Sequence, residues 1–530
     1  MSIIIRSLSY IHSDKERLFQ NINATINKGQ KISLVGNNGC GKSTLLQIIA
    51  GKLSSTEGDI VSEEKPYYIP QHFGQYNNLS IAQALGIENK LQALRAILKG
   101  DTAPQHFESL NEDWDIEERA HAALSFWKIQ HLKLSQTMNT LSGGEKTKVF
   151  LSGILIHSPQ IILLDEPSNH LDLESRNLLY DFIKKSKSTI LVVSHDRKLL
   201  NLLDTTIELE NGNIEVFGGN YDFYFKQKTN ARNALEEDIK SKEKALRKAK
   251  AVEKEAMERQ QKLDARGKKK QEKAGLPTIM MKTLKNNAEK STSRTKGVHA
   301  EKINTISEEV SQLRKELSDS EKMKINLNNS ALHKKKILVS AKEINFSYGN
   351  NFLWKESLNF MITSGERIVI KGVNGSGKTT LIKIILGEFF PCTGTITKAE
   401  TKAIYIDQDY SLINNRLTVY EQAQKYNYSS LQEHDVKIRL NRFLFSKDCW
   451  DKSCRLLSGG ERMRLLLCCL TISNQAPDII VLDEPTNNLD IQNVEILTSA
   501  INEYEGTLIV VSHDTQFLEE INIEREIIVE

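Results

Sequence analysis

Ile161-Ile162-Leu163-Leu164-Asp165-Glu166-Pro167 has a second copy, ending in Leu482-Asp483-Glu484-Pro485, which lies 318 positions later (483 − 165). Each copy is a short apolar run that ends in two carboxylates, which predicts a buried parallel strand that delivers acids at its carboxyl end. The first acid, Asp165 or Asp483, suits a Mg²⁺ ion held through water. The second, Glu166 or Glu484, suits a base or water-orienting group for attack on a γ-phosphate. Taken alone, one copy has a simpler interpretation as a core strand that ends in two solvated acids.

The composition is that of a soluble, multidomain protein. Apolar residues make up 39% of the 530 and charged residues 26%, which is typical of globular chains. No apolar run approaches the ~18 residues that a membrane span needs, and Ser2-Ile3-Ile4-Ile5 is too short for a signal peptide. The six cysteines form no metal-binding or disulfide framework, so we expect reduced thiols and a cytoplasmic protein.

The charge is distributed unevenly along the chain. Residues 223–336 hold 30 Lys and Arg against 16 Asp and Glu, a net charge of +14, whereas the whole chain carries only +3. The remainder is therefore acidic, at −11. A basic segment between two acidic halves points to a nucleic-acid partner.

The motifs repeat at a nearly constant offset, which predicts two copies of one domain. The offset is 338 for Tyr10 and Tyr348, 336 for Lys42 and Lys378, 337 for Gln71 and Gln408, 316 for the two Leu-Ser-Gly-Gly-Glu motifs, and 318 for His195 and His513. We therefore place one domain at 1–222, a spacer at 223–336 and the second domain at 337–530. The offset falls by about twenty after the glutamine, so the first copy is predicted to carry an insertion, within about 84–115.

Each copy contains a strand, a glycine-rich loop and a helix. The strands are predicted at Lys31 to Val35 and at Arg367 to Lys371. The glycines let backbone N–H groups converge on phosphate oxygens, the lysine reaches the β- and γ-phosphates, and Ser43 or Thr379 offers a hydroxyl to Mg²⁺. The loop residues predicted to bind ATP are Gly36, Asn37, Asn38, Gly39, Cys40, Gly41, Lys42, Ser43 and Thr44, and Gly372, Val373, Asn374, Gly375, Ser376, Gly377, Lys378, Thr379 and Thr380. Cys40 lies beside Lys42 in this loop, a setting that predicts a lowered thiol pKa.

A glutamine and a histidine follow further predicted strands in each copy. Gln71 and Gln408 could offer an amide to Mg²⁺ or to the attacking water, although a lone glutamine after a strand is more often a surface residue. His195 and His513 follow the apolar runs Thr189 to Val193 and Thr507 to Val511, each within Ser-His-Asp. A lone histidine is usually structural, but this placement recurs beside the acids and predicts a γ-phosphate contact.

The motif Leu-Ser-Gly-Gly-Glu is a turn that opens a helix, with serine as the N-cap and an acid in the first turn. Its residues are Ser142, Gly143, Gly144 and Glu145 in the first copy and Ser458, Gly459, Gly460 and Glu461 in the second. Exposed N–H groups here have the same anion-binding chemistry as the phosphate loop, from which the motif is distant in sequence.

In this order the motifs resemble those of the ATP-binding cassette ATPases, over about four-fifths of the chain. The resemblance implies two α/β cassettes, each a P-loop NTPase core with a β-subdomain and a helical subdomain, which stack head to tail within one monomer. It implies that Lys42 and Ser43 form one ATP site together with Ser458 and Gly460. Lys378 and Thr379 would form the other site together with Ser142 and Gly144. It also implies that Tyr10 and Tyr348 stack on adenine, and that ATP is hydrolysed with Mg²⁺.

The spacer is predicted to be a helical hairpin with a basic tip. Residues 223–275 lack proline and favour one long helix, which Gly275-Leu276-Pro277 ends. A second helix is expected from about Val298 to Leu327, since Ile303, Ile306, Val310, Leu313 and Leu317 step by 3 and 4. A charged tether is the simpler alternative. A stiff basic hairpin suits structured RNA, and the candidate RNA-binding residues are Arg266, Lys268, Lys269, Lys270, Lys273, Ile279, Met280, Met281, Lys282 and Lys285.

Two cassettes joined by a basic hairpin resemble the ABC-F proteins. That resemblance implies a ribosome partner near the tRNA exit site, with the linker reaching the peptidyl-tRNA and the peptidyl-transferase centre, and no membrane partner. The long spacer and short insertion are more similar to antibiotic-protection members than to housekeeping ones. Two rivals remain at this point: the ATPase subunit of a membrane transporter, and a DNA-associated ATPase, whose repair members usually carry zinc cysteines that are absent here.

Overall fold

The computed structural model describes residues 3–12, 17–273, 297, 300–314, 332–333, 335–349, 351–373, 375–473, 477–487 and 489–529. Within these ranges, residues 260, 264 and 267–273 are described by their main chain alone. The chain divides into two compact units, Met1–Asp222 with Lys322–Glu530, and Phe223–Glu321. We call residues 1–222 cassette 1, residues 337–530 cassette 2 and the second unit the hairpin.

Cassette 1 contains a six-stranded sheet and a three-stranded sheet. The larger has the order β5-β6-β7-β3-β8-β9, with β5 (Tyr67–Ile69), β6 (Ile161–Asp165), β7 (Thr189–Val193), β3 (Lys31–Val35), β8 (Thr205–Glu210) and β9 (Asn213–Phe217). All pairings in it are parallel except β8 with β9. The smaller, antiparallel sheet has the order β2-β1-β4, with β2 (Arg17–Ile26), β1 (Ile3–Ile11) and β4 (Glu57–Ser62).

Cassette 2 repeats this plan with one strand fewer in its larger sheet. That sheet has the order β14-β15-β16-β12-β17 and is parallel throughout, with β14 (Ala403–Ile406), β15 (Ile479–Asp483), β16 (Thr507–Val511), β12 (Arg367–Lys371) and β17 (Arg525–Ile528). The antiparallel sheet has the order β11-β10-β13, with β11 (Leu358–Thr363), β10 (Ile337–Asn345) and β13 (Thr393–Lys398).

The central strands are continuous apolar runs because both faces of a parallel sheet are covered. In β15, Ile479 and Val481 pack into a core shared with β10, β12 and helix α11 (Lys378–Leu386). Ile480 and Leu482, on the opposite face, pack into a second core formed with the helices of the cassette. The period of two along a strand produces this division.

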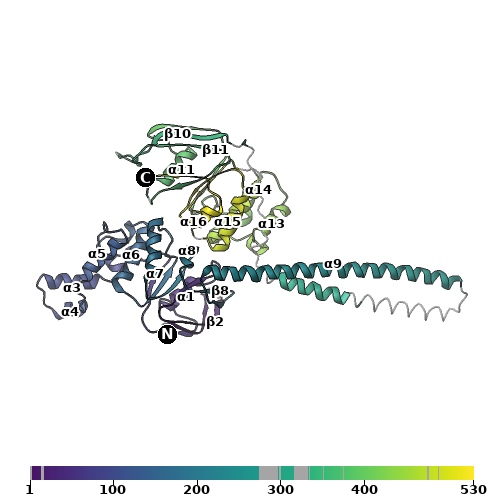
Figure 1. The fold of residues 1–530 in the computed structure, drawn as a ribbon, viewed down its shortest axis with the longest axis horizontal. Coiled ribbons are helices and arrows are strands. Elements are labelled where there is room, and N and C mark those ends of the chain that lie inside the picture. Colours follow the sequence, from purple (N-terminus) through teal and green to yellow (C-terminus); the bar gives the residue numbers. More distant parts are fainter. Residues whose placement is uncertain are drawn as a thin grey trace. The chain divides into compact units, whose positions relative to one another are not determined.

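The helices cover the sheets and form a separate helical part in each cassette (Figure 1). Cassette 1 has α1 (Lys42–Ile49), α2 (Ile81–Ala84), α3 (Glu88–Leu98), α4 (Pro104–Leu110), α5 (Ile116–Phe126), α6 (Gly143–His157), α7 (Leu173–Lys185) and α8 (Arg197–Leu200). Besides α11, cassette 2 has α12 (Val419–Lys425), α13 (Glu433–Arg442), α14 (Gly459–Ser473), α15 (Ile491–Glu503) and α16 (Thr515–Glu520). Two helices, α3 and α4, occupy the range in which we place the insertion.

The hairpin begins with α9 (Tyr221–Lys273), 53 residues long and therefore about 80 Å at ~1.5 Å per residue. Residues 300–314 form a second helix that lies against it, where Arg314 Nη2 lies 2.5 Å from Glu243 Oε1 and Lys242 pairs with Glu309. Val310 is buried, and Ile303, Ile306 and Leu313 are half-buried. The lower exposure of these positions follows the predicted steps of 3 and 4; Leu317 lies outside the described residues.

Two further features concern the cysteines and the helices. All six cysteines are free of disulfide bonds in the structure. Among the helices that the structure describes, none has both the length and the apolar character needed to cross a membrane.

Candidate functional site

The carboxyl ends of four parallel strands bring several of the predicted site residues of cassette 1 to one edge of the sheet. Adjacent strands β5, β6, β7 and β3 lead respectively to Gln71, to Asp165 and Glu166, to His195, and to the loop 36–41. Because parallel strands end at one edge of the sheet, side chains distant in sequence meet there. In cassette 2, β14, β15, β16 and β12 do the same for Gln408, Asp483 and Glu484, His513, and the loop 372–377.

Both glycine-rich loops fold back around their lysine. Lys42 Nζ donates to the carbonyls of Gly36 at 2.7 Å and Asn37 at 3.0 Å. Lys378 Nζ donates to Gly372 at 2.8 Å and Val373 at 3.1 Å. Each ammonium is thus held inside its loop, at the start of helix α1 or α11, where an anion would also meet the helix N-terminus.

Glycine is required where the loop leaves β3. A Cβ on Gly36 would lie 2.3 Å from the carbonyl oxygen of Leu209. The start of the second loop has the same constraint, since a Cβ on Gly372 would lie 2.4 Å from Val529 O. Of the predicted loop residues, Asn374 lies outside the described residues.

A hydroxyl, a carboxylate and a tyrosine form a matching cluster in each cassette. Ser43 Oγ donates to Asp165 Oδ1 at 3.1 Å, and Tyr68 donates to Asp165 Oδ2 at 3.2 Å. Thr379 Oγ1 donates to Asp483 Oδ2 at 3.3 Å, and Tyr405 donates to the same oxygen at 2.8 Å. Burial raises the pKa of Asp165. Hydroxyl and carboxylate oxygens are the ligands that Mg²⁺ prefers, so each cluster fits that ion.

The glutamate after each strand lies beside the histidine of the next strand. His195 Nε2 lies 3.2 Å from Glu166 Oε1, and His513 Nε2 lies 3.5 Å from Glu484 Oε1. Both glutamates have a left-handed backbone, with φ of 51° and 50°. Non-glycine residues adopt this conformation at a cost, and it recurs at functional sites.

Burial controls the protonation of these groups. It raises the pKa of Glu166 to about 8 and that of Glu484 to about 7. Burial also lowers the pKa of His195 to about 3 and that of His513 to about 4. Both histidines are therefore neutral at pH 7, and in the absence of ligand the glutamates take up protons near neutral pH.

The two Leu-Ser-Gly-Gly-Glu motifs form helix N-termini. Ser142 caps α6: its hydroxyl accepts from Glu145 N at 3.3 Å, and Glu145 Oε2 accepts from Ser142 N at 2.9 Å. Ser458 and Glu461 make the same exchange at the start of α14, at 3.3 and 2.7 Å. The predicted serine N-caps are confirmed, and Gly143, Gly144, Gly459 and Gly460 occupy the first turns.

The prediction for the thiol of Cys40 is wrong in direction. Burial raises the pKa of Cys40, and the positive charge of Lys42 only partly opposes that effect. The sequence places the lysine beside the thiol but does not show that the loop and its surroundings enclose the sulfur. Desolvation of the thiolate therefore dominates.

The aromatic and amide residues occupy less enclosed positions. Tyr348 is 71% exposed, and its hydroxyl lies 2.9 Å from Thr380 Oγ1. Tyr10 is half-buried, with its ring centroid 6.1 Å from that of Phe19. Gln71 and Gln408 are both half-buried just beyond β5 and β14.

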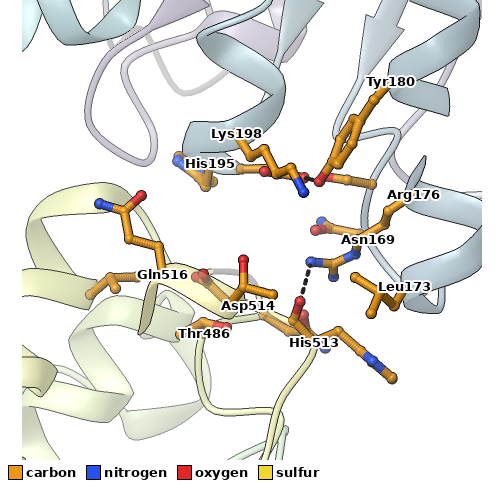
Figure 2. A pocket seen from close by; sticks show the side chains of 15 residues that line it. Asn169, Leu173, Arg176, Tyr180, His195, Lys198, Thr486, His513, Asp514 and Gln516 are labelled. Atoms are coloured by element: carbon orange, nitrogen blue, oxygen red, sulfur yellow. Dashed lines mark hydrogen bonds between the residues drawn. The ribbon is translucent and has the colours of Figure 1, made fainter. Parts of the chain in front are cut away.

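Residues that follow the Asp-Glu strands approach the other cassette. Asp490 Oδ2 accepts from the main-chain N–H of Asn38, in the phosphate loop of cassette 1, at 3.2 Å. Arg176 Nη1 donates to the carbonyl of His513 at 3.4 Å, as Figure 2 shows. Arg176 and His513 both line a cavity of about 50 Å³, which is room for only a few water molecules.

The sequence analysis missed Tyr68 and Tyr405, as well as Asp490 and Arg176. For the tyrosines a signal was available, because their offset of 337 equals that of Gln71 and Gln408. Asp490 likewise has a counterpart in Asp172 at the offset of 318. Arg176 has no repeated signal, because Val494 occupies the equivalent position.

The hairpin exposes its basic side chains along α9. Every lysine and arginine from 240 to 266 is exposed, namely Lys240, Lys242, Lys244, Arg247, Lys248, Lys250, Lys254, Arg259, Lys262 and Arg266. Lys268, Lys269, Lys270 and Lys273 belong to α9, although only their main chain is described. Ile279, Met280, Met281, Lys282 and Lys285 lie outside the described residues.

Comparisons with known proteins agree with this geometry. A family model described as "ABC transporter" matches residues 19–169 and 356–487. The chain is 31% identical over 516 residues to "ATP-binding protein Uup" of Buchnera aphidicola subsp. Acyrthosiphon pisum, covering 93% of this chain and 75% of that protein. It is 30% identical over 535 residues to "ABC transporter F family member 2" of Arabidopsis thaliana, covering 94% of this chain and 72% of the relative.

A solved structure shares the fold. It is a complex of an archaeal ribosomal stalk protein with the archaeal ribosome recycling factor aABCE1, matched with a TM-score of 0.56 and 20% identity. The alignment covers 98% of this chain and 87% of that one.

Proposed function

The chain belongs to the ABC transporter family as an ABC-F-type tandem ATPase, and from this premise we propose that it binds the ribosome and uses cycles of ATP binding and hydrolysis to move its hairpin there. ATP hydrolysis and ATP binding follow from the family. The ribosome as the partner, the roles of individual residues and a cytoplasmic location are the proposal.

The observation that carries the ribosome assignment is the basic hairpin between two cassettes. All ten lysines and arginines of residues 240–266 are exposed along one helix about 80 Å long. A stiff rod with solvated cations fits an RNA surface, where phosphate contacts and shape dominate over base readout. The name of one matched structure supports this choice, since that complex contains a ribosome recycling factor.

Each ATP site has groups for binding and for hydrolysis. Lys42 and Lys378 would neutralise the β- and γ-phosphates within their loops. Ser43 with Asp165, and Thr379 with Asp483, would hold Mg²⁺, with Gln71 and Gln408 at the same edges of the sheets. The ion would neutralise phosphate charge as the γ-phosphoryl group is transferred.

The glutamates and histidines would act on the attacking water. Glu166 and Glu484 lie at the strand ends, where a carboxylate can orient a water molecule and accept its proton. His195 and His513 are neutral, so each can donate a hydrogen bond to a γ-phosphate oxygen without carrying a charge. Tyr10 and Tyr348 would stack on adenine.

Head-to-tail pairing would complete both sites within one monomer. Ser458 and Gly460 would meet the ATP held by Lys42, and Ser142 and Gly144 the ATP held by Lys378. The hydrogen bond from Asn38 to Asp490 supports this pairing, because a loop of cassette 2 already touches the phosphate loop of cassette 1. Two bound ATP molecules would close the pair and change the angle of the hairpin, and hydrolysis would release it.

Co-sedimentation tests the partner. Purified protein with ATP would be centrifuged separately with ribosomes, membrane vesicles and duplex DNA. We expect it to pellet with ribosomes alone, and binding to membranes or DNA without ribosome binding would overturn the assignment. Growth and translation assays with and without drugs of the peptidyl-transferase region would then separate a general translation factor from a ribosomal-protection protein.

A further inference from the structure

The two ATP sites differ at one buried position next to their reactive groups. Helices α7 and α15 start and end at equivalent residues with an offset of 318, and the same offset relates Asp165, Glu166, Asp172 and His195 to identical residue types in cassette 2. Arg176 on α7 departs from this identity, because Val494 occupies its place on α15. The pseudo-symmetry therefore fails at a charged residue.

Arg176 is buried and reaches the second cassette. The residue is only 9% exposed, and its Nε donates to the carbonyl of Leu171 at 3.1 Å. Its Nη1 donates to the carbonyl of His513 at 3.4 Å, across the cavity drawn in Figure 2. Val494 lines the same cavity and has no group that can donate to the first cassette.

The positive charge of Arg176 acts on the reactive side of cassette 2. Its electrostatic influence extends to Glu484, His513 and Asp514. A buried guanidinium is costly unless acceptors or opposite charges surround it, and a planar fork with fixed donors positions the groups that it contacts. The first site receives no such cation from residue 494.

We propose that Arg176 of cassette 1 is a positioning residue for the second ATP site, where it fixes the segment carrying His513, and that it makes the two sites unequal. This inference rests on the proposed roles of Glu166 and Glu484 but not on the ribosome as partner. Hydrolysis by the purified protein is therefore sufficient to test it.

The test isolates each site by mutation of the other. A Glu166→Gln background reports the second site, and a Glu484→Gln background reports the first. Arg176→Val copies the residue of cassette 2. In the Glu166→Gln background, which reports the second site, it should lower kcat about tenfold, a barrier change of about 1.4 kcal/mol, with less than a threefold change in KM. In the Glu484→Gln background, which reports the first site, it should alter kcat less than about twofold. Arg176→Lys keeps the charge without the fork and should restore part of the loss.

Arg197 provides the control for a general weakening of the cassette contact. It also comes from cassette 1, and its guanidinium lies 3.0 Å from Glu495 and 3.2 Å from Glu520 of cassette 2. Arg197→Thr, which copies the equivalent Thr515, should change kcat alike in both backgrounds. An equal loss for Arg176→Val in the two backgrounds, or no loss in either, overturns the inference. Near-normal hydrolysis by the Glu166→Gln, Glu484→Gln double variant would instead overturn the roles on which it rests.

Discussion

Asp490 Oδ2 accepts a hydrogen bond from the main-chain N–H of Asn38 at 3.2 Å, although 452 positions separate the two residues. The same carboxylate caps helix α15, since its Oδ1 accepts from Asn493 N at 2.8 Å. One side chain therefore links the start of a helix in cassette 2 to the phosphate loop of cassette 1.

Two substitutions separate these roles of Asp490. Asp490→Ala removes both contacts and should cost about 1 kcal/mol of stability, the usual loss for an N-cap. Asp490→Ser keeps a capping oxygen but is too short to reach Asn38, so its thermal midpoint should stay near that of the wild type. Both variants should slow hydrolysis at the first site, measured in the Glu484→Gln background. Normal turnover in Asp490→Ser would mean that the contact with Asn38 has no role.

The paired glutamates can be tested together. Glu166→Gln with Glu484→Gln should retain ATP binding but lower hydrolysis by about a hundredfold or more, because a positioned base typically contributes that much. If closure on two ATP molecules holds the protein on its partner, this variant should also stay bound to ribosomes through a wash with ATP. Nucleotide binding, phosphate release and co-sedimentation would be measured on the same preparation. Near-normal phosphate release would contradict the assignment of both residues.

The raised pKa of Glu166 predicts how stability depends on pH. In the folded, nucleotide-free protein its pKa is about 8, against an ordinary value of 4.5. The folded state therefore holds the proton more tightly than the unfolded state, so this contribution is present below pH 4.5 and is lost as the pH rises towards 8. Glu166→Gln, which cannot ionise, should flatten the fall of the thermal midpoint between about pH 5 and 8. An unchanged slope would show that Glu166 does not titrate in this window.

The thiol of Cys40 should react slowly at neutral pH. Burial raises its pKa, so the thiolate that attacks a maleimide is scarce and its share increases with pH. Cys392 is exposed and serves as an internal control. Peptide mass spectrometry over a pH series should find Cys40 labelled later than Cys392, and MgATP should protect only Cys40. Fast labelling of Cys40 at pH 7, or labelling that MgATP does not change, would count against this environment.

The lysines near the end of α9 should contribute to ribosome affinity. Replacing Lys268, Lys269, Lys270 and Lys273 by Ser should weaken binding. The slope of log affinity against log salt concentration should fall in magnitude by up to about three, because fewer phosphate contacts mean that fewer counterions are released on binding. Binding would be measured at several salt concentrations. A control variant with the same change of charge replaces four exposed lysines of cassette 1, Lys28, Lys65, Lys99 and Lys133. The tether interpretation would stand if the hairpin variant kept the affinity and slope of the wild type.

The apolar residues 279–281, which lie outside the described residues, should contribute differently from the lysines. Ile279, Met280 and Met281 carry no charge that could steer binding, so replacing all three by Ala should lower ribosome affinity less than the lysine variant does. The same change should abolish the effect of the protein on translation or drug protection if the tip acts in the peptidyl-transferase region. Equal loss of affinity in the two variants would contradict this division of roles.

The sequence by itself determined the repeat, the central strands and the residue types that follow those strands. Strands Lys31–Val35, Thr189–Val193, Arg367–Lys371 and Thr507–Val511 have the predicted bounds, because a strand buried on both faces must be a continuous apolar run. Serine N-caps and strand-end acids follow from equally local rules.

Only the tertiary structure decided how these groups affect one another. The raised pKa of Cys40, the tyrosines on Asp165 and Asp483, and the contact of Arg176 with His513 depend on segments that meet from distant parts of the chain. Desolvation and hydrogen bonding depend on what encloses a group, and the local sequence contains no record of those neighbours. The repeat also gave no signal for Arg176, because Val494 occupies the equivalent position and the contact with His513 is visible only in the folded chain.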